Sequence, residues 1–175
     1  MSNIRRIGLL AGPGTGKSTT AAKLFAELKI LGYDVEHIPE FVKTMAHEGR
    51  FPTSFDQVYI FGQQIHKEDI VLRHVTNLVT DCPIIMCCAY AKYYGSAGHE
   101  SLLEIAHEFE RQFPSFNLLL ERDVPYVEKG RYQNSQQAND FDKFLLDFMV
   151  LNHQPFERVS VKNFPEMVKK IQDRI

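Results

Sequence analysis

The sequence predicts an α/β fold with three layers, in which helices cover both faces of a central parallel sheet of about five strands. Short apolar segments of strand length alternate with helix-length segments along all 175 residues. Strands buried on both faces read as continuous apolar runs, and helices join such strands into a parallel sheet. A second observation is that the first apolar segment runs into a glycine-rich loop and then into a helix-forming sequence.

The order of the elements follows from the same pattern. The first helix is amphipathic and ends before Gly32, because glycine adopts the left-handed conformation that terminates helices. The loop 48–52 separates the next two helices. The expected strands span 4–10, 35–38, 78–80, 116–120 and 158–161. The expected helices span 17–31, 39–47, 55–75, 137–151 and 165 to the C-terminus, with mostly helix between 81 and 116.

The loop after the first strand is the most informative segment. Residues 11–18 read Ala-Gly-Pro-Gly-Thr-Gly-Lys-Ser, which matches the phosphate-binding P-loop pattern G-x-x-x-x-G-K-[ST] except that Ala11 replaces the first glycine. An ordinary glycine-rich turn is the alternative interpretation. It leaves unexplained a lysine and a hydroxyl at these offsets between a strand and a helix. The expected fold is therefore the P-loop NTPase fold.

The chemistry of this loop explains its residue types. Glycines let backbone N–H groups turn toward a polyphosphate, and the following helix presents its partially positive N-terminus. Lys17 reaches the β- and γ-phosphates, and Ser18 holds Mg²⁺. The residues expected to bind ATP are Gly12, Pro13, Gly14, Thr15, Gly16, Lys17, Ser18 and Thr19.

Composition fits one compact domain over residues 1–175, with 44% hydrophobic and 24% charged residues. The net charge of −2 gives no global basic field, so a nucleic-acid partner would need a local basic patch. Cys82, Cys87 and Cys88 lack the spacing of a zinc site. No apolar run approaches the ~18–20 residues of a membrane span. A reduced, cytoplasmic protein is expected, in the host cytoplasm if a phage encodes it.

Ligands of such sheets bind beyond the carboxyl ends of the strands, so residues just after strands are candidates for catalysis. Glu40 follows the second strand, Asp81 the third and Arg122 the fourth. Asp81 is a candidate for holding Mg²⁺ or for accepting a proton, and the alternative is a helix N-cap. Glu40 is a candidate base, and the alternative is a first-turn glutamate that complements the helix dipole.

The segment around Arg122 and Arg131 predicts a lid over about 122–136. Its cations lie beside Gly130, and arginines carried by a closing lid can neutralise the charge of a phosphoryl-transfer transition state. A solvated loop with incidental charges is the alternative. Both arginines are candidate catalytic residues.

The helix over 55–75 interleaves aromatic and amide side chains. An amide offers a donor and an acceptor that suit a pyrimidine edge, and an aromatic ring can stack on the base. Gln63 and Gln64 are therefore candidate substrate contacts, although the aromatics can equally be core. Arg50 or Lys43 could hold an acceptor phosphate.

Four segments together carry a family resemblance: the loop 11–18, Pro39-Glu40-Phe41, Thr80-Asp81-Cys82-Pro83 and Gly130-Arg131-Tyr132-Gln133. In this order they resemble the small thymidylate-kinase-like P-loop kinases of bacteriophages, over nearly the whole chain. That group includes enzymes that phosphorylate 5-hydroxymethyluracil within phage DNA, a step toward hypermodified thymidines.

The resemblance implies ATP and Mg²⁺ as cofactors, with Lys17 and Ser18 in the ATP and Mg²⁺ roles. It gives Glu40 and Asp81 the acidic roles and Arg131 the lid role. The implied acceptor is a pyrimidine nucleotide, within DNA or free. Action on DNA would need a patch of cations at the cleft mouth, for which the candidates are Lys43, Arg50, Lys92, Lys129 and Arg131.

Two other readings stay open. One is a kinase of free deoxynucleosides or their monophosphates, which the slightly acidic composition favours. The other is a P-loop ATPase or switch, although the chain lacks the Asn-Lys-x-Asp sequence of a GTP switch. The oligomeric state is not fixed by the sequence, and a dimer is the commonest closed assembly.

Overall fold

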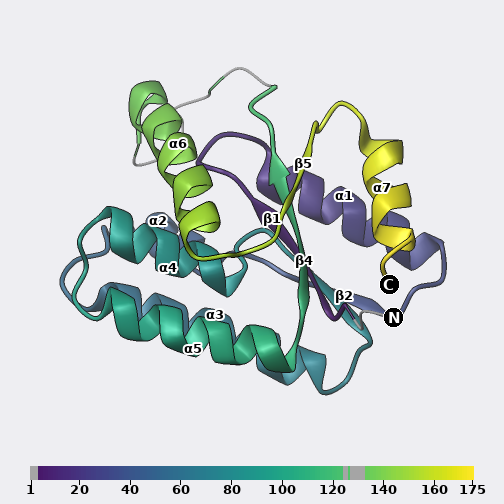
Figure 1. Cartoon of the computed structure of the whole chain (residues 1–175), viewed down its shortest axis with the longest axis horizontal. Coiled ribbons are helices and arrows are strands. Elements are labelled where there is room, and N and C mark those ends of the chain that lie inside the picture. The colour runs from purple at the N-terminus through teal and green to yellow at the C-terminus, as the bar shows by residue number, and fades with distance from the viewer. Residues whose placement is uncertain (1–3, 124–125, 127–132) are drawn as a thin grey trace.

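Five parallel strands form one sheet in the order β2-β3-β1-β4-β5 (Figure 1). The strands are β1 (Arg6–Leu10), β2 (Val35–Ile38), β3 (Asn77–Thr80), β4 (Ser115–Leu120) and β5 (Glu157–Val159). The computed structural model describes residues 4–123, 126 and 133–175. The predicted three-layer α/β fold is confirmed.

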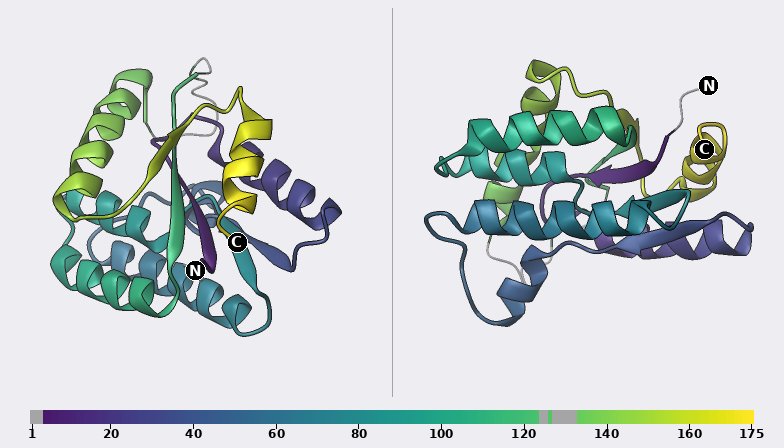
Figure 2. Two further views of the ribbon diagram at one scale, coloured as in Figure 1. Left: turned by 45° about the vertical axis from the view of Figure 1, so that its right-hand side comes forward. Right: turned by 90° about the horizontal axis from the view of Figure 1, so that it is seen from below.

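Helices cover both faces of this sheet, as the two further views show most clearly (Figure 2). They are α1 (Lys17–Ile30), α2 (Val42–His47), α3 (Asp56–Leu72), α4 (Ile84–Tyr93), α5 (His99–Gln112), α6 (Ser135–Leu151) and α7 (Phe164–Gln172). One buried cluster packs α1 and α7 on one face of the sheet. A second cluster packs α3, α4, α5 and α6 on the other face. Along β1, Ile7 and Leu9 belong to the first cluster and Leu10 to the second, as the alternation of side chains along a strand requires.

The strand order places β1 at the point where the chain changes direction across the sheet. After β1 the chain builds β2 and β3 on one side, and it then crosses to β4 and β5 on the other. Ligands of open parallel sheets bind beyond the carboxyl ends of the strands at such a point. The loops after β1 and β3 therefore open at the same edge.

Local interactions explain where the helices differ from their predicted bounds. The helix predicted from residue 39 begins at Val42, and the backbone N–H groups of Glu40 and Phe41 before it donate to side chains of other elements. Gly95 and Gly98, with φ of 64° and 79°, separate α4 from α5. Asn134 caps α6 in a capping box with Gln137, which sets its start at residue 135.

Within the described residues, no helix combines the length and the apolar character needed to cross a membrane.

Candidate active site

The P-loop connects β1 to α1 and depends on glycines at two positions. Gly14 and Gly16 have φ of 81° and 87°, a region that other residues rarely adopt, and Gly16 is the N-cap of α1. A Cβ on Gly14 would lie 2.6 Å from the ring of Tyr126. Thr15 closes the loop from inside, since its hydroxyl donates a 3.0 Å hydrogen bond to Gly12 O.

Lys17 is buried at the first position of α1 and turns its ammonium back into the P-loop. Its Nζ donates to the carbonyl oxygens of Ala11, at 2.7 Å, and Gly12, at 3.1 Å. Burial lowers the pKa of Lys17, while nearby Glu40 acts in the opposite direction. The ammonium is thus held at the loop by acceptors that a phosphate oxygen can replace.

Asp81 joins the end of β3 to the segment after β2. It is fully buried, and its Oδ1 accepts a 2.8 Å hydrogen bond from Glu40 N while its Oδ2 accepts one of 2.8 Å from Lys43 Nζ. Burial alone would raise the pKa of Asp81, but hydrogen bonds from Lys43, Ser18 and Glu40 N hold it below the ordinary value. Pro83, not Asp81, is the N-cap of α4. Asp81 is therefore a charged carboxylate that faces the site.

Glu40 is the second carboxyl group of the site, and only 14% of its side chain is exposed. Burial raises the pKa of Glu40 above the ordinary value of a glutamate, against the attraction of Lys17. Its Oε2 lies 4.0 Å from Lys43 Nζ. A shielded carboxyl with a raised pKa is suited to accept a proton near neutral pH.

Gln64 fixes the backbone next to Glu40. It is fully buried on α3, where its Oε1 accepts a 3.2 Å hydrogen bond from Phe41 N. Its Nε2 donates to Thr80 Oγ1 at 3.3 Å and to Glu68 Oε1 at 3.2 Å. Two side chains, Asp81 and Gln64, thus hold successive backbone N–H groups of the Glu40–Phe41 segment.

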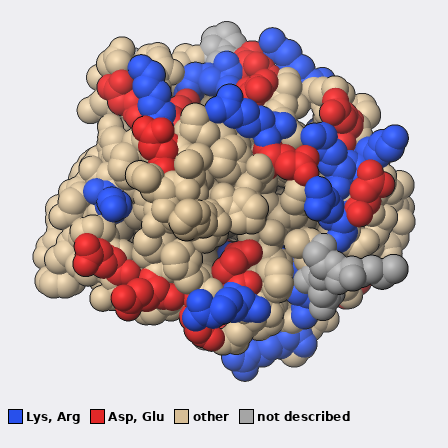
Figure 3. Space-filling view, in the orientation of Figure 1, with Lys and Arg blue, Asp and Glu red and all other residues tan. Residues whose placement is uncertain are grey.

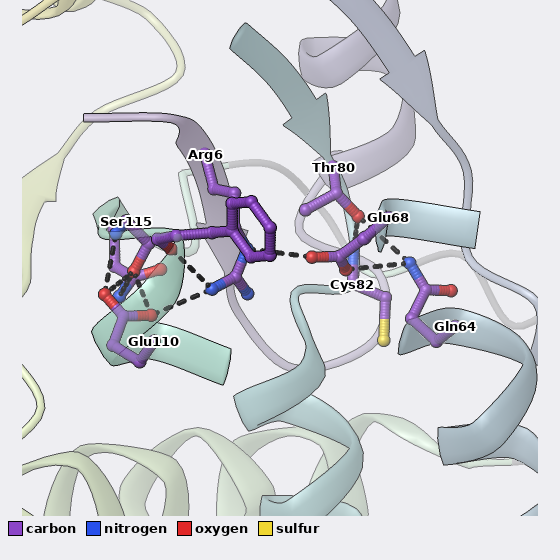
Figure 4. A network of polar contacts seen from close by, with 9 residues as sticks. Arg6, Gln64, Glu68, Thr80, Cys82, Glu110 and Ser115 are labelled. Carbon is purple, nitrogen blue, oxygen red and sulfur yellow. Dashed lines mark hydrogen bonds and ion pairs between the residues drawn. The ribbon is translucent and has the colours of Figure 1, made fainter. Parts of the chain in front are cut away.

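Gln64 is one end of a buried polar network that runs along one face of the sheet, from α3 past β1 to β4 (Figure 4). Arg6, on β1, lies between Glu68 of α3 and Glu110 of α5, with an N–O distance of 2.9 Å to each. Ser115 donates to Glu110, which closes the network at β4. Arg6 and Glu68 are almost wholly buried, so each satisfies a charge that would otherwise be unpaired in the core.

A carboxylate of α6, which the sequence did not predict at the site, stabilises the P-loop. Asp142, on α6, accepts a 2.7 Å hydrogen bond from Gly12 N through Oδ1. Its Oδ2 accepts from Arg122 Nε at 2.8 Å, and Arg122 NH1 donates to Pro13 O at 2.9 Å. The missed signal is the position of Asp142 between Ala138 and Leu145 on the buried face of α6.

A cavity of about 700 Å³ lies beside these residues, within the range of ~300–1,000 Å³ that small-molecule sites occupy. Glu40 and Lys43 line it together with Pro13, Gly14, Gly16, Lys17, Ser18 and Thr19 of the P-loop and its helix. Beyond them the wall includes Val42, Ala46, Phe51, Ile60, Cys87, Tyr90 and Tyr94, with the amides of Gln57 and Gln133. The Tyr90 ring stacks on Phe141, with centroids 4.1 Å apart. The P-loop thus opens into a largely apolar, aromatic chamber.

A protein-family model described as "AAA domain" matches residues 6–166. The chain belongs to this AAA domain family. Among solved structures, the AAA domain is similar to the NadR protein in complex with NR, with 12% identity and a TM-score of 0.78. The alignment covers 98% of this chain and 52% of the NadR chain, so the AAA domain spans about half the length of NadR.

A second similar structure is a cysteine-to-alanine mutant of the APS kinase CysC from Mycobacterium tuberculosis. It has 13% identity and a TM-score of 0.52, and the alignment covers 98% of this chain and 96% of that chain. No curated protein sequence matches the chain. The likeness to these structures establishes that the AAA domain has the fold of P-loop kinases.

The AAA domain brings together most of the residues predicted at the ends of the strands. Lys17, Ser18 and Glu40 line the cavity, and Asp81 contacts Lys43 at its edge. Arg122 reaches the P-loop instead of lying on a free lid, because Asp142 and Pro13 O bind its guanidinium. Of the predicted ATP ligands, Gly12 and Thr15 are buried within the P-loop.

Among the residues that the structure describes, the three predicted substrate contacts are not part of the cavity lining. Gln64 lies in the core and holds Phe41 N, and neither it nor the half-buried Gln63 lines the cavity. Arg50 is 55% exposed and lies 3.6 Å from Glu48 and 3.9 Å from Asp56. Gln57, about two turns before the predicted pair on α3, lines the cavity instead. Arg131, Lys129 and most of the predicted lid fall outside the described residues.

The donor set beside the P-loop fits Mg²⁺. Ser18 Oγ and Asp81 Oδ2 both accept from the Lys43 ammonium, so these oxygens already hold a cation. Mg²⁺ prefers such oxygen ligands and takes the rest from phosphates and water. In the part of the chain that the structure describes, no three His, Cys, Asp or Glu side chains form a metal cluster. Few protein side chains would therefore bind the metal, and phosphates and water would supply its other ligands.

Proposed function

We propose that the protein is a P-loop kinase, which transfers the γ-phosphoryl group of ATP to a hydroxyl group or phosphate oxygen of a pyrimidine nucleotide. The observation that carries this proposal is the position of Glu40 in one cavity with Lys17 and Ser18. That cavity continues past Glu40 into an aromatic chamber large enough for an acceptor. A protein that only hydrolyses a nucleotide needs no such chamber. The likeness to an APS kinase agrees with this proposal.

The residues of the chain supply positioning and charge for the transfer. Lys17 leaves the carbonyl oxygens of the loop for phosphate oxygens, and the backbone N–H groups of the P-loop bind the others. For a hydroxyl acceptor, Glu40 takes the proton as the acceptor oxygen bonds to the γ-phosphorus. The bond from that phosphorus to its bridging oxygen breaks, and ADP leaves. Ser18 and Asp81 would hold Mg²⁺, which neutralises charge on the phosphate oxygens.

The proposed acceptor is the hydroxymethyl group of 5-hydroxymethyluracil in phage DNA. The resemblance to phage kinases supports it. A base in duplex DNA must be extruded before it reaches such a cavity, whose aromatic wall offers rings on which a base can stack. Phe51, in the loop between α2 and α3, lines the cavity and is 56% exposed, and Phe55, which is 64% exposed, lies four residues further along the chain. Aromatic side chains at the mouth of such a chamber can stack on neighbouring bases.

A free deoxynucleoside or its monophosphate is the second candidate acceptor. The distribution of charge favours it: positive and negative side chains are interspersed over the face drawn in Figure 3, and the net charge is −2. Binding of DNA relies on many contacts between cations and phosphates. A small acceptor needs no such field.

A label-transfer assay with γ-labelled ATP decides between these acceptors. It offers, in parallel, DNA containing 5-hydroxymethyluracil, the same DNA with thymine, free deoxynucleosides and deoxynucleoside monophosphates. We expect label in the modified DNA and none in the thymine control. Label in a free nucleoside or monophosphate alone would replace DNA with the second candidate. Label in no acceptor would contradict the kinase proposal.

A further inference from the structure

The ammonium of Lys43 lies where a metal ion would be expected. Lys43 is in the first turn of α2, and its Nζ donates hydrogen bonds to Ser18 Oγ and to Asp81 Oδ2, the latter at 2.8 Å. It also lies 4.0 Å from Glu40 Oε2. Ser18 Oγ and Asp81 Oδ2 are the two oxygens that are suited to bind Mg²⁺. One cation of the chain thus holds both oxygens at once.

The ammonium and a metal ion cannot share these oxygens. Mg²⁺ binds oxygen at about 2.0–2.1 Å, so an ion on Ser18 and Asp81 would occupy the space of Lys43 Nζ. Two positive charges within ~4 Å also repel each other, by about 1 kcal/mol per pair of unit charges even in water. Metal binding at these residues therefore requires Lys43 to leave.

The structure gives Lys43 a way out. Its side chain is 41% exposed and lines the cavity, whereas Asp81 is fully buried beneath it. The short helix α2 carries Lys43 on the cavity wall, on the same side as Glu40. Rotation about the side-chain bonds of Lys43 moves the ammonium from Asp81 into the cavity without any change in the backbone.

We propose that Lys43 and the metal ion exchange at Ser18 and Asp81. In the nucleotide-free protein Lys43 neutralises Asp81 and excludes divalent cations. When a metal-nucleotide complex binds, its phosphates supply the remaining ligands, and Lys43 is released into the cavity beside Glu40, where its charge faces the anionic reactants. The metal accordingly enters with the nucleotide and not before it. This inference rests on the proposed function, because it assumes that the P-loop binds a metal-nucleotide complex.

Binding of Mn²⁺ to the nucleotide-free protein, measured by electron paramagnetic resonance, tests the exchange without any reaction. Mn²⁺ is the probe for Mg²⁺. We expect weak binding to the wild type and binding about tenfold or more tighter to Lys43→Met, since a unit positive charge has been removed next to the ligands. Lys43→Arg should bind as weakly as the wild type. Lys169→Met, at an exposed position on α7, makes the same change in net charge and should also match the wild type.

Equal affinity of the wild type and Lys43→Met would overturn the exchange, and so would equal tightening by Lys43→Met and Lys169→Met. Lys43→Gln serves as a second neutral variant if Lys43→Met lacks a cooperative thermal transition. A non-hydrolysable ATP analogue should give the wild type tight Mn²⁺ binding; no gain in a wild type that binds the analogue in an equilibrium titration would also overturn the exchange. The label-transfer assay reports separately on the kinase, so that the failure of either proposal is recognised without the other.

Discussion

Asp81 accepts a hydrogen bond of 2.8 Å from the backbone N–H of Glu40. This contact joins the end of β3 to the segment after β2 and places the two carboxyl groups of the site in a fixed relation. Asp81 is charged and held by donors, whereas burial keeps the pKa of Glu40 high. The two groups are thus suited to different tasks, the first to holding cations and the second to accepting a proton.

Glu40→Gln should lower the rate of phosphoryl transfer by about 10²–10⁴-fold, the usual contribution of a general base, because the amide cannot accept the proton. The affinity for ATP should change little. Steady-state kinetics with ATP titrations measure both. Glu36→Gln, on β2 with a half-exposed side chain, is the matched control. An unchanged rate would show that Glu40 only shapes the segment before α2.

Gln64→Leu should disturb the site from the core. Phe41 N loses its buried acceptor, so the free energy of unfolding should fall by about 1–3 kcal/mol. The kcat should fall more than the KM for ATP rises, because Glu40 loses its support while the P-loop is intact. Denaturant unfolding and kinetics check these effects against Gln63→Leu, the half-buried neighbour. If both variants behave alike, Gln64 has no positioning role.

Asp142→Ala should loosen the P-loop, because it removes the acceptor of Gly12 N and the partner of Arg122. We expect the free energy of unfolding to fall by about 1–3 kcal/mol and the Kd for ATP to rise, since the loop would have to be ordered on binding. Thermal unfolding and equilibrium titration measure the two effects. Asp147→Ala, an exposed aspartate of the same helix, should be near neutral. ATP affinity that is equal in both variants would contradict this role.

Glu68 should make stability depend on pH in a direction that is unusual for a salt-bridged acid. Burial raises its pKa in the folded protein, in spite of Arg6. The folded state then binds the proton more tightly than the unfolded state, so stability is greatest below the unfolded pKa of about 4.3 and falls as the pH rises to the folded pKa. Chemical denaturation across this range, compared with Glu68→Gln, isolates the effect. If the wild type instead becomes more stable relative to Glu68→Gln as the pH rises, the Arg6 ion pair dominates.

The sequence predicted the fold and the P-loop because both rest on local patterns. Apolar strands, Gly32 and the Gly16-Lys17-Ser18 sequence each act within a few residues, and the structure places them as expected. The proximity of Glu40 and Asp81 could also be predicted, because the carboxyl ends of neighbouring parallel strands meet at one edge. These predictions needed no knowledge of which helices pack together.

Contacts between distant elements could not be predicted. Asp142 reaches Gly12 across 130 positions of the chain, and no local pattern links α6 to the P-loop. The sequence makes Gln64 a candidate base contact because its amide offers both a donor and an acceptor. Gln57 and Gln64 are seven residues apart and lie on the same side of α3, but this side meets the cavity at Gln57 and the core at Gln64. A helical sequence fixes which residues share a face but not where along the helix that face meets the ligand.

The fate of the γ-phosphoryl group is the most direct test of the central claim. Label from γ-labelled ATP is followed into acceptor and into inorganic phosphate, with and without the best acceptor of the panel, in the wild type and in Lys17→Ala. We expect the acceptor to take most of the label in the wild type and Lys17→Ala to transfer none. Release of inorganic phosphate that is the same with and without every acceptor would contradict it, and would make the protein an ATPase or a switch.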